Sequence, residues 1–275
     1  MSNKNNLNEI LLKIKKSNII DTLKEKDMPR FFVKNEQIKD ETIEIQGEDV
    51  KHIKNVLRKQ IGDNIEICDQ NTGKSYICGI EKIGNESILT NIIKELQGYN
   101  DKIKVDIYQG LPKADKMELI IQKSVELGAN AIIPVSMKRC VVKIDSKDEQ
   151  KKITRWQKIA ESAAKQSGRE IIPEVKNIVN VEKIIQLIKE YDCVIVAYEN
   201  EKDNTIKREL LKIKENIHDK VKIAVIIGPE GGLEEKDVEM LKQNGAKIVT
   251  LGHRILRTET VALNVLSVIM YELES

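Results

Sequence analysis

Residues 223–262 read IAVIIGPEGGLEEKDVEMLKQNGAKIVTLGHRILRTETVA and contain two apolar runs that each end in a glycine-bearing loop. The first run, Ile223–Ile227, is short and wholly apolar, which is typical of a strand buried on both faces. The chain must then turn at Gly228–Gly232, because proline fixes one dihedral while glycine permits positive φ and close approach of another molecule. This stretch predicts a parallel strand followed by a binding turn.

A helix and a second strand–loop unit follow this turn. Acidic residues within 234–237 favour a helix N-terminus, and Gly245 is expected to end that helix. Residues 248–251 predict a second strand, and residues 252–257 predict a second loop before an apolar helix that starts near Thr260. Two such loops, at the ends of neighbouring strands, can together hold one ligand.

The composition limits the class of protein. The chain has 275 residues, of which 40% are hydrophobic and 33% are charged, so it is long enough for two domains. No apolar run approaches the roughly 20 residues that span a bilayer, and no secretory signal is recognisable, so we expect a cytoplasmic protein without a membrane partner. The four cysteines form no CxxC pair and only three histidines are present, so we expect free, mostly buried thiols and no metal site.

The net charge does not by itself indicate nucleic-acid binding. Residues 1–27 hold six lysines and four acidic residues, which accounts for the whole chain's net charge of +2 and leaves residues 28–275 neutral. Any nucleic-acid surface must therefore be a local patch. Apolar residues at i, i+3, i+4 and i+7 from Leu7 predict either a basic amphipathic helix that contacts a membrane, RNA or a partner, or a marginal helix at a mobile terminus.

Residues 28–98 have the pattern of a small β-barrel. Short β-like runs are separated by turn signals such as Gly62–Asp63 and Gly84–Asn85. A helix expected over residues 49–59 would bury four apolar residues: Val50, Ile53, Val56 and Leu57. The polar residues of this region are either a solvated surface or part of an RNA-binding surface: Arg30, Lys51, His52, Lys54, Arg58 and Lys59.

From Tyr99 onward, strand and helix patterns alternate, and we expect the domain boundary at residues 98–102. The alternation predicts a parallel sheet covered by helices on both faces, with ligands bound beyond the carboxyl ends of the strands. Trp156 lies in the apolar stripe of a helix predicted from Thr154, so core packing is favoured over base stacking. The cluster KRCVVK at 138–143 is either a basic binding patch or an exposed edge.

The last predicted helix, residues 260–274, is apolar almost all round. A terminal helix of this kind is poorly hidden in a monomer, so we expect it to be buried between the sheet and a second subunit of a homodimer. The alternative is an ordinary internal core helix.

The two loops do not match the common nucleotide-binding motifs. GPEGG is neither GxGxxG nor GxxxxGK[ST], so a nucleotide-dependent oxidoreductase lacks its fingerprint. Glu230 would repel a polyphosphate. Backbone amides, glycines and one acid instead suit a ligand that carries a positive charge and forms hydrogen bonds with the main chain.

Five segments together resemble the RsmE family of SPOUT-class methyltransferases: QGLPKADKMELIIQKSVELGA (109–129), WQKIAESAAKQSGR (156–169), VAYENE (196–201), IIGPEGGLEEKD (226–237) and LGHRILRTETVAL (251–263). The resemblance runs in order from MPRFFV at Met28 to the C-terminus. It implies methylation of uridine N3 in 16S ribosomal RNA of the small subunit, with S-adenosylmethionine as the methyl donor. The implied α/β architecture is an extension (1–27), a PUA-like β-barrel that binds RNA (28–98), and a SPOUT domain with a C-terminal trefoil knot (99–275).

The resemblance also implies residues for each part of the site. Those expected to bind S-adenosylmethionine lie in three loops: Ala197, Tyr198 and Glu199; Gly228, Pro229, Glu230, Gly231 and Gly232; Leu251, Gly252, Ile255, Leu256, Arg257, Glu259, Thr260 and Ala262. Those expected to contact RNA phosphates are Arg30, Arg58, Lys113, Lys116 and Arg139.

Methylation of uridine N3 requires that its proton leave, since the imide nitrogen is a poor nucleophile. We expect Arg257 and Arg169 to stabilise the charge that develops on the base carbonyls, and Glu259 or Glu230 to accept the proton. Arg257 could instead pair with Glu259 and shape the loop. Two alternative functions are open: a related methyltransferase acting on a ribose 2'-hydroxyl or on transfer RNA, and a non-catalytic ribosome-assembly factor that binds no cofactor.

Overall fold

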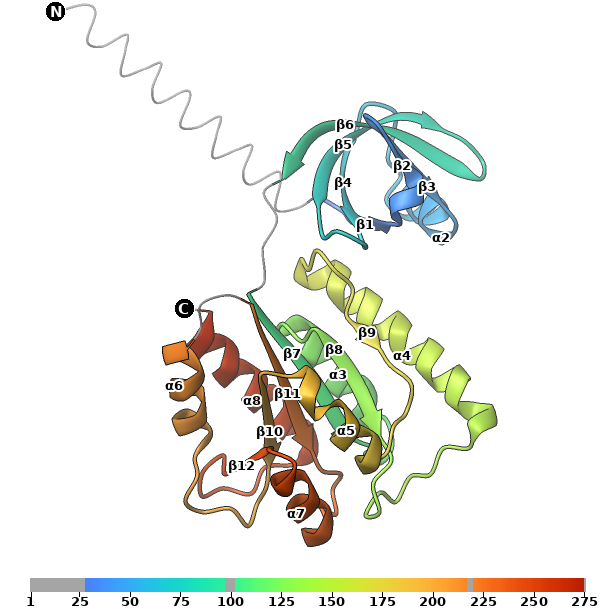
Figure 1. Ribbon diagram of the computed structural model, residues 1–275. Helices are drawn as coiled ribbons and strands as arrows, with labels where there is room; N and C mark the ends of the chain where they lie inside the picture. Colours follow the sequence, from blue (N-terminus) through green and yellow to red (C-terminus); the bar gives the residue numbers. More distant parts are fainter. Residues whose placement is uncertain (1–27, 97–101, 217–219, 275) are drawn as a thin grey trace, which may run out of the picture. The chain divides into compact units, whose positions relative to one another are not determined.

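The computed structural model of the protein describes residues 28–96, 102–216 and 220–274. They form two compact units, one before and one after residues 97–101 in the chain (Figure 1). The helix expected near Leu7, and most of the boundary expected at 98–102, lie outside these residues. Within them, no helix combines the length and apolar character that crossing a membrane would require.

The first unit is a six-stranded sheet with the order β1-β4-β5-β6-β3-β2. Neighbouring strands in this sheet are antiparallel, except that β1 and β4 pair in parallel. The elements are β1 (Arg30–Val33), η1 (Asn35–Gln37), β2 (Ile38–Lys39), β3 (Thr42–Gln46), α2 (Glu48–Lys51), η2 (His52–Val56), β4 (Asn64–Asp69), β5 (Ser75–Ile83) and β6 (Ser87–Leu96).

One core fills this unit, because alternate residues of the strands point to the same side. Ile43, Ile45, Ile65, Ile67 and Ile88 are each at most 1% exposed and belong to one cluster. The sheet therefore curls around its own side chains, as the barrel prediction requires. In the described residues no ladder joins β1 to the two-residue strand β2, so the barrel is open at this edge.

The helix expected over residues 49–59 was only partly right. An α-helical turn, α2, is followed by the π-helix η2, in which the N–H of Leu57 donates to the carbonyl of His52 at 2.9 Å. A π turn rotates by less per residue than an α turn, so side chains three apart drift around the axis. Val56 consequently leaves the buried face and is 66% exposed.

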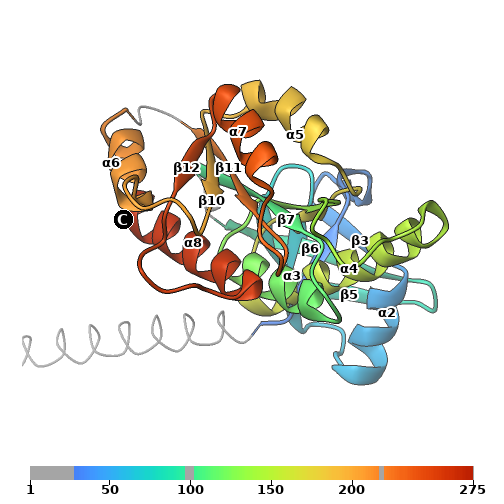
Figure 2. The same cartoon turned by 90° about the horizontal axis from the view of Figure 1, so that it is seen from below.

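The second unit is a parallel α/β sheet with the order β12-β10-β11-β7-β8-β9, which confirms the predicted parallel sheet of the α/β class. Helices α5 and α7 cover one face, and α3 and α8 cover the other (Figure 2). The strands are β7 (Ile103–Gly110), β8 (Ala131–Val135), β9 (Glu174–Val175), β10 (Cys193–Ala197), β11 (Val221–Ile227) and β12 (Lys247–Val249). The helices are α3 (Lys116–Glu126), α4 (Ser146–Ser167), α5 (Val181–Leu187), η3 (Ile188–Glu190), α6 (Ile206–Asn216), α7 (Glu235–Gln243) and α8 (Thr258–Leu273).

Helix α4 covers the β9 edge of this sheet. Gln157 accepts a hydrogen bond from the N–H of Val175 at 2.7 Å and donates one to the carbonyl of Pro173 at 3.2 Å. An exposed strand edge invites pairing with other chains, and these bonds occupy its free backbone groups. Trp156 is 5% exposed on the same helix, which confirms the prediction of core packing.

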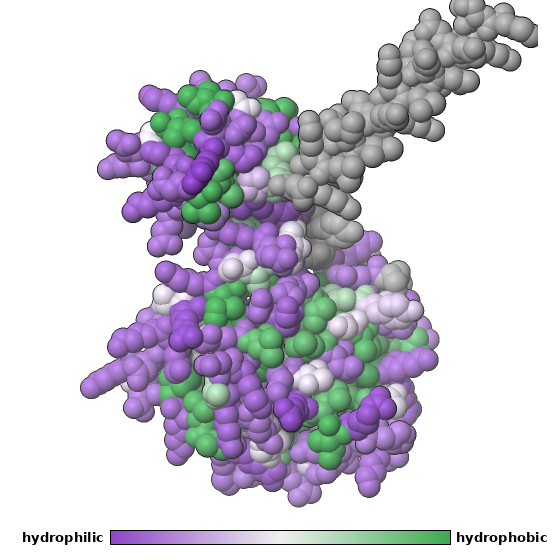
Figure 3. Space-filling model, turned by 180° about the vertical axis from the view of Figure 1, so that it is seen from behind, coloured by the Kyte–Doolittle hydropathy of each residue, from purple (hydrophilic) through white to green (hydrophobic). Residues whose placement is uncertain are grey.

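Helix α8 is neither fully buried nor a simple surface helix. Five residues face the interior of the unit: Thr258, Ala262, Val265, Leu266 and Ile269. Other apolar residues remain partly exposed, and Tyr271 is 79% exposed. Figure 3 shows the side of the unit on which α3 and α8 lie, where apolar groups gather among polar ones.

Candidate active site

Three loops at the carboxyl ends of β10, β11 and β12 surround a cavity of about 500 Å³. Its volume is in the range of small-molecule sites, and its position is where open parallel sheets bind ligands. The cavity is lined by Lys116, Ala197, Tyr198, Glu199, Ile227, Gly228, Pro229, Glu230, Gly232, Thr250, Leu251, Gly252, His253, Arg254, Ile255, Leu256, Arg257, Thr258 and Val261.

The structure brings most of the expected cofactor residues to this cavity. Four do not line it: Gly231, Glu259, Thr260 and Ala262. Gly231 faces Arg139 outside the cavity, Ala262 is buried within α8, and Thr260 is exposed. Glu259 lies behind Lys116, with which it forms an ion pair.

Sequence reasoning missed several lining residues. Thr250, His253 and Arg254 stand beside residues that were chosen, so continuity of the loop was a usable signal. Thr258 lies between two chosen residues and gave the same signal, whereas Lys116 gave none, because its place at the cavity depends on a contact with a distant segment.

Two close backbone approaches shape the GPEGG turn. A Cβ at Gly110, the last residue of β7, would lie 2.6 Å from both the ring Cδ and the backbone nitrogen of Pro229. Gly232 has a φ of 71°, and a Cβ there would collide with the carboxylate of Glu199. Because glycine has no Cβ, the turn can pack closely against β7 at Gly110 and against the loop after β10 at Gly232.

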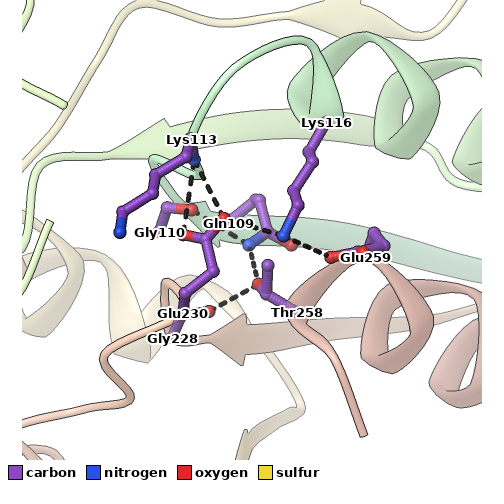
Figure 4. Close-up of polar contacts among 8 residues, drawn as sticks. All are labelled: Gln109, Gly110, Lys113, Lys116, Gly228, Glu230, Thr258 and Glu259. Atoms are coloured by element: carbon purple, nitrogen blue, oxygen red, sulfur yellow. Dashed lines mark hydrogen bonds and ion pairs between the residues drawn. The ribbon is translucent and has the colours of Figure 1, made fainter. Parts of the chain in front are cut away.

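Three charged side chains form a cluster at the cavity: Lys116 and Glu230 line it, and Glu259 lies behind Lys116 (Figure 4). We call it the Lys116 cluster: Lys116 Nζ lies 3.0 Å from Glu230 Oε1 and 3.3 Å from Glu259 Oε2. The backbone N–H of Lys113 also donates to Glu230, at 3.0 Å to Oε1. Glu259 Oε2 is buried, and its contact with the Lys116 ammonium compensates its charge.

Lys116 and Glu230 stabilise each other in their ionised forms. Burial by itself would raise the pKa of Glu230, but hydrogen bonds from Lys116 and from backbone N–H groups outweigh it and lower that pKa. The hydrogen bond to Glu230 raises the pKa of Lys116. A carboxylate held in this way is a poor proton acceptor, which favours an electrostatic role for Glu230 over general-base catalysis.

A buried hydroxyl links the GPEGG turn to α8 and β7. Thr258 Oγ1 donates to the carbonyl of Gly228 at 2.7 Å and accepts from Gln109 Nε2 at 2.8 Å (Figure 4). Gln109 is fully buried and also donates to the carbonyl of Gly110 at 3.0 Å. One side chain thus fixes the first residue of the turn to two other elements.

Cations hold the outer side of the same turn. Arg139 Nη1 donates to the carbonyl of Gly231 at 3.1 Å, and Lys138 Nζ lies 3.0 Å from Glu234 Oε2. The KRCVVK cluster therefore supports the turn. Neither sequence interpretation, a basic binding patch or an exposed edge, included this role. Both cations are exposed as well.

The loop after β10 is fixed by Glu201. Its carboxylate accepts the backbone N–H groups of Lys202, Asp203 and Asn204 at 2.9–3.0 Å. The bond from Asn204 is the largest of the causes that lower the pKa of Glu201. The loop then runs beside β12, where Asn204 Nδ2 donates to the carbonyl of Ile248 at 2.9 Å.

Arg257 lines the cavity and is exposed, with its guanidinium unpaired within the described residues. The alternative in which it pairs with Glu259 is not seen, since Glu259 binds Lys116 instead. Its charge is therefore accessible to a substrate. His253 and Arg254 are also exposed and line the same cavity.

Arg169 lies away from the cavity. Its Nη2 donates to the carbonyl of Ala129 at 3.3 Å, just before β8. Arg169 therefore lies near the amino-terminal ends of the strands, whereas the cavity lies at their carboxyl ends. A Cβ at Gly128 would contact both Arg169 and Met270, which places Arg169 near the end of α8. The rise from Thr258 to Met270 along α8 is roughly 18 Å. The structure therefore does not bring Arg169 together with the other expected catalytic residues.

The expected RNA contacts have different surroundings. In the first unit, Arg30 forms an ion pair with Glu66 at 2.6 Å, whereas Arg58 is exposed and has a φ of 51°. In the second unit, Lys113 and Arg139 are exposed, and Lys116 belongs to the cavity. No group of three His, Cys, Asp or Glu side chains suited to a metal occurs among residues 28–96, 102–216 and 220–274.

Comparisons with known proteins identify the family of this chain. The family described as RNA methyltransferase domain matches residues 99–270, and that described as RNA methyltransferase PUA domain matches residues 45–93. The chain is 39% identical to ribosomal RNA small subunit methyltransferase E of Bacillus subtilis, with 90% of this chain and 98% of that one covered. It is 31% identical to the Mesomycoplasma hyopneumoniae protein of the same name, over 87% of this chain and 98% of that one.

A solved structure has the same fold. The crystal structure of ribosomal RNA small subunit methyltransferase E from Neisseria gonorrhoeae, bound to S-adenosylmethionine, superposes with a TM-score of 0.74 at 30% identity. The match covers 89% of this chain and 97% of that one. The parallel sheet has three loops around a ligand-sized cavity, a PUA domain precedes it, and the matches span most of the chain. The chain belongs to the ribosomal RNA small subunit methyltransferase E family.

Proposed function

We propose that this protein transfers a methyl group from S-adenosylmethionine to N3 of a uridine in 16S ribosomal RNA. The observation that carries the proposal is the three-loop cavity with the Lys116 cluster in its wall, in a chain of this family. The related Neisseria protein is described as bound to S-adenosylmethionine. A substrate in the small ribosomal subunit would place the protein in the cytoplasm.

The residues of the cavity fit S-adenosylmethionine. Backbone groups of the loops can bond its adenine and ribose, and Ile227, Leu251 and Leu256 offer apolar contact. Glu199 and Glu230 supply negative charge for a sulfonium and an ammonium group. When bound, the cofactor supplies a methyl group on positively charged sulfur.

The chain's own residues would then activate the base. The exposed guanidinium of Arg257 can bond a uracil carbonyl oxygen and stabilise the anion formed when the N3 proton leaves. Glu230 is held by Lys116 and Lys113, and Glu259 lies behind Lys116 outside the cavity lining, so we assign both carboxylates to electrostatics and not to accepting the proton. We propose that those residues of the set named from the sequence that line the cavity contact the cofactor directly, and that Gly231, Glu259, Thr260 and Ala262 act only through their neighbours.

We propose that exposed cations of both units bind RNA phosphates, with Arg58 in the PUA-like unit (28–98) and Lys113 and Arg139 in the methyltransferase unit (99–275) as the main candidates. Arg30 is a weaker one because Glu66 already neutralises it at 2.6 Å. Phosphate contacts of this kind make binding fall with salt.

We also propose a homodimer formed through α8. The helix keeps partly exposed apolar residues in addition to its buried face, and Tyr271 is 79% exposed near its end. Antiparallel packing of two α8 helices would bring Arg169 of one copy toward the start of α8 in the other. A catalytic role for Arg169 requires such an arrangement, because it is distant from the cavity of its own chain.

Replacing Tyr271 with Asp is expected to give a folded monomer with at least tenfold lower methyltransferase activity, since a charge would be buried in the interface. Light scattering after size exclusion gives the mass, and the Tyr271→Phe protein is the matched control. A monomeric variant with full activity would refute the coupling of dimerisation to catalysis.

We further propose that the C-terminal part of the chain forms a trefoil knot. Support comes from the sheet order, in which β12 pairs with β10, and from hydrogen bonds that join Asn204 to Ile248 and Thr250. Pulling the two ends apart in a single-molecule experiment should leave a chain shorter than the full contour length. A fully extended chain would exclude a knot.

The function is tested by nucleoside mass spectrometry of 16S ribosomal RNA from cells with and without the gene, and of unmodified small subunits treated with purified protein and S-adenosylmethionine. We expect 3-methyluridine only when the protein is present. Methyl groups on ribose or in transfer RNA would overturn the substrate assignment. Absence of cofactor binding in a calorimetric titration would instead indicate a non-catalytic assembly factor.

A further inference from the structure

One ammonium group in the cavity wall forms ion pairs with two carboxylates. In the Lys116 cluster the lysine comes from the start of α3, Glu230 from the turn after β11, and Glu259 from the first turn of α8 (Figure 4). The distances from Nζ are 3.0 Å and 3.3 Å. With all three groups ionised, the cluster keeps one excess negative charge instead of two.

These contacts conflict with the expected role of Lys116 at an RNA phosphate. Its side chain is 31% exposed, and turning outward would leave Glu230 (25%) and Glu259 (15%) facing each other as like charges. In a partly buried site such repulsion is only weakly screened. The cost of breaking the cluster therefore favours a role within the cavity.

The charge of this wall matters for the proposed reaction. In methyl transfer the bond between the methyl carbon and sulfur breaks, its electron pair stays on sulfur, and the new bond forms from uracil N3, whose proton has left. The sulfur changes from a cation to a neutral thioether. A strongly negative wall binds the cation better than the neutral product, so it stabilises the ground state and opposes transfer.

We propose that Lys116 is a positioning residue that holds Glu230 and Glu259 in place and cancels one of their two charges, so that the cavity does not hold the cationic sulfur too tightly for transfer. This inference rests on the proposed function, because it requires the cavity to bind S-adenosylmethionine. The raised pKa of Lys116, caused first by its hydrogen bond to Glu230, supports an ammonium that stays charged at neutral pH.

The test compares two ligands that differ in this charge, S-adenosylmethionine and S-adenosylhomocysteine. Their dissociation constants are measured by calorimetry on the full chain carrying Lys116→Met, which removes the ammonium and keeps the aliphatic stem. We expect the preference for the cationic ligand over the neutral one to rise about fivefold, the order expected for one uncompensated charge a few ångströms from the ligand. The kcat should fall, and Lys116→Arg should restore both values toward the wild type.

Lys123→Met is the matched control. It removes the same charge from the same helix, α3, but the Lys123 ammonium pairs with Glu126 at 2.8 Å and does not line the cavity. The preference between the two ligands should stay at the wild-type value in this protein. Lys116→Gln serves as a second test variant if the Met protein does not fold.

The other outcomes are distinct. If the affinity for both ligands fell equally, Lys116 would only stabilise the structure of the cavity, and the proposal would be overturned. An unchanged preference, together with a salt dependence of 16S ribosomal RNA binding reduced by about one phosphate contact, would return Lys116 to the RNA surface and also overturn it. A wild-type protein that binds neither ligand would overturn the proposed function itself.

Discussion

Replacing Gly110 with Ala is expected to weaken S-adenosylmethionine binding about 100-fold, which corresponds to about 3 kcal/mol. The added Cβ would lie 2.6 Å from two atoms of Pro229 and 3.0 Å from the carbonyl carbon of Gly228. These are ring and backbone atoms at the start of the GPEGG turn, where Pro229 is buried, so the collision is relieved only if the turn moves. Because that turn forms a wall of the cavity, cofactor affinity should fall more than global stability. Calorimetric titration measures the affinity.

A second glycine in a strand separates this effect from the general cost of losing a glycine. At Gly79 in β5, the one tight contact of a Cβ would be with the end of the Ile93 side chain, at 3.3 Å, and that side chain can move. Gly79→Ala should bind the cofactor as the wild type does. If Gly110→Ala also bound it normally, the contact with Pro229 would not govern the position of the turn.

Replacing Thr258 with Val is expected to destabilise the methyltransferase unit by about 2 kcal/mol, the usual cost of unpaired buried polar groups, and to weaken cofactor binding about tenfold. Valine has nearly the same shape but no hydroxyl, so the carbonyl of Gly228 loses its donor and Gln109 Nε2 loses an acceptor. Thr258 is 5% exposed, so water does not readily replace these bonds. The link between the GPEGG turn and α8 would be lost with them.

Trp156 gives a direct measurement of this change. It is the only tryptophan, it is 5% exposed and it lies in α4, so its fluorescence during urea unfolding reports the methyltransferase unit alone. Thr258→Ser keeps the hydroxyl and should retain most of the stability and affinity. A Val protein as stable as the Ser protein would mean that the hydroxyl bridge contributes little.

The elements that could be predicted are those with a local physical cause. The all-apolar run Ile223–Ile227 became a strand paired on both sides, and the helix with Trp156 buried its apolar stripe. The GPEGG turn followed from glycine and proline alone. These features depend on neighbours in sequence, so periodicity and turn chemistry were sufficient to find them.

Other features depended on contacts that no local pattern records. The π turn at η2 rotated Val56 out of the core, although its spacing fitted an α-helix. Helix α4 began at Ser146, eight residues before the predicted start at Thr154, and in this added part Glu149 accepts a hydrogen bond from the N–H of the distant Ile178 at 3.0 Å. Arg169 looked like a site residue because it follows a polar segment, yet the fold places it near the amino-terminal ends of the strands, away from the cavity.

By itself, the sequence of this protein determined the alternation of strands and helices, the turn after β11 and, through its motifs, the family to which the chain belongs. The tertiary structure alone decided which charges share the cavity. Lys116 joined Glu230 and Glu259 because parallel strands deliver their loops to one edge of a sheet, and side chains distant in sequence then meet there. Charge pairing acts over a few ångströms in space, and a linear pattern does not contain those distances.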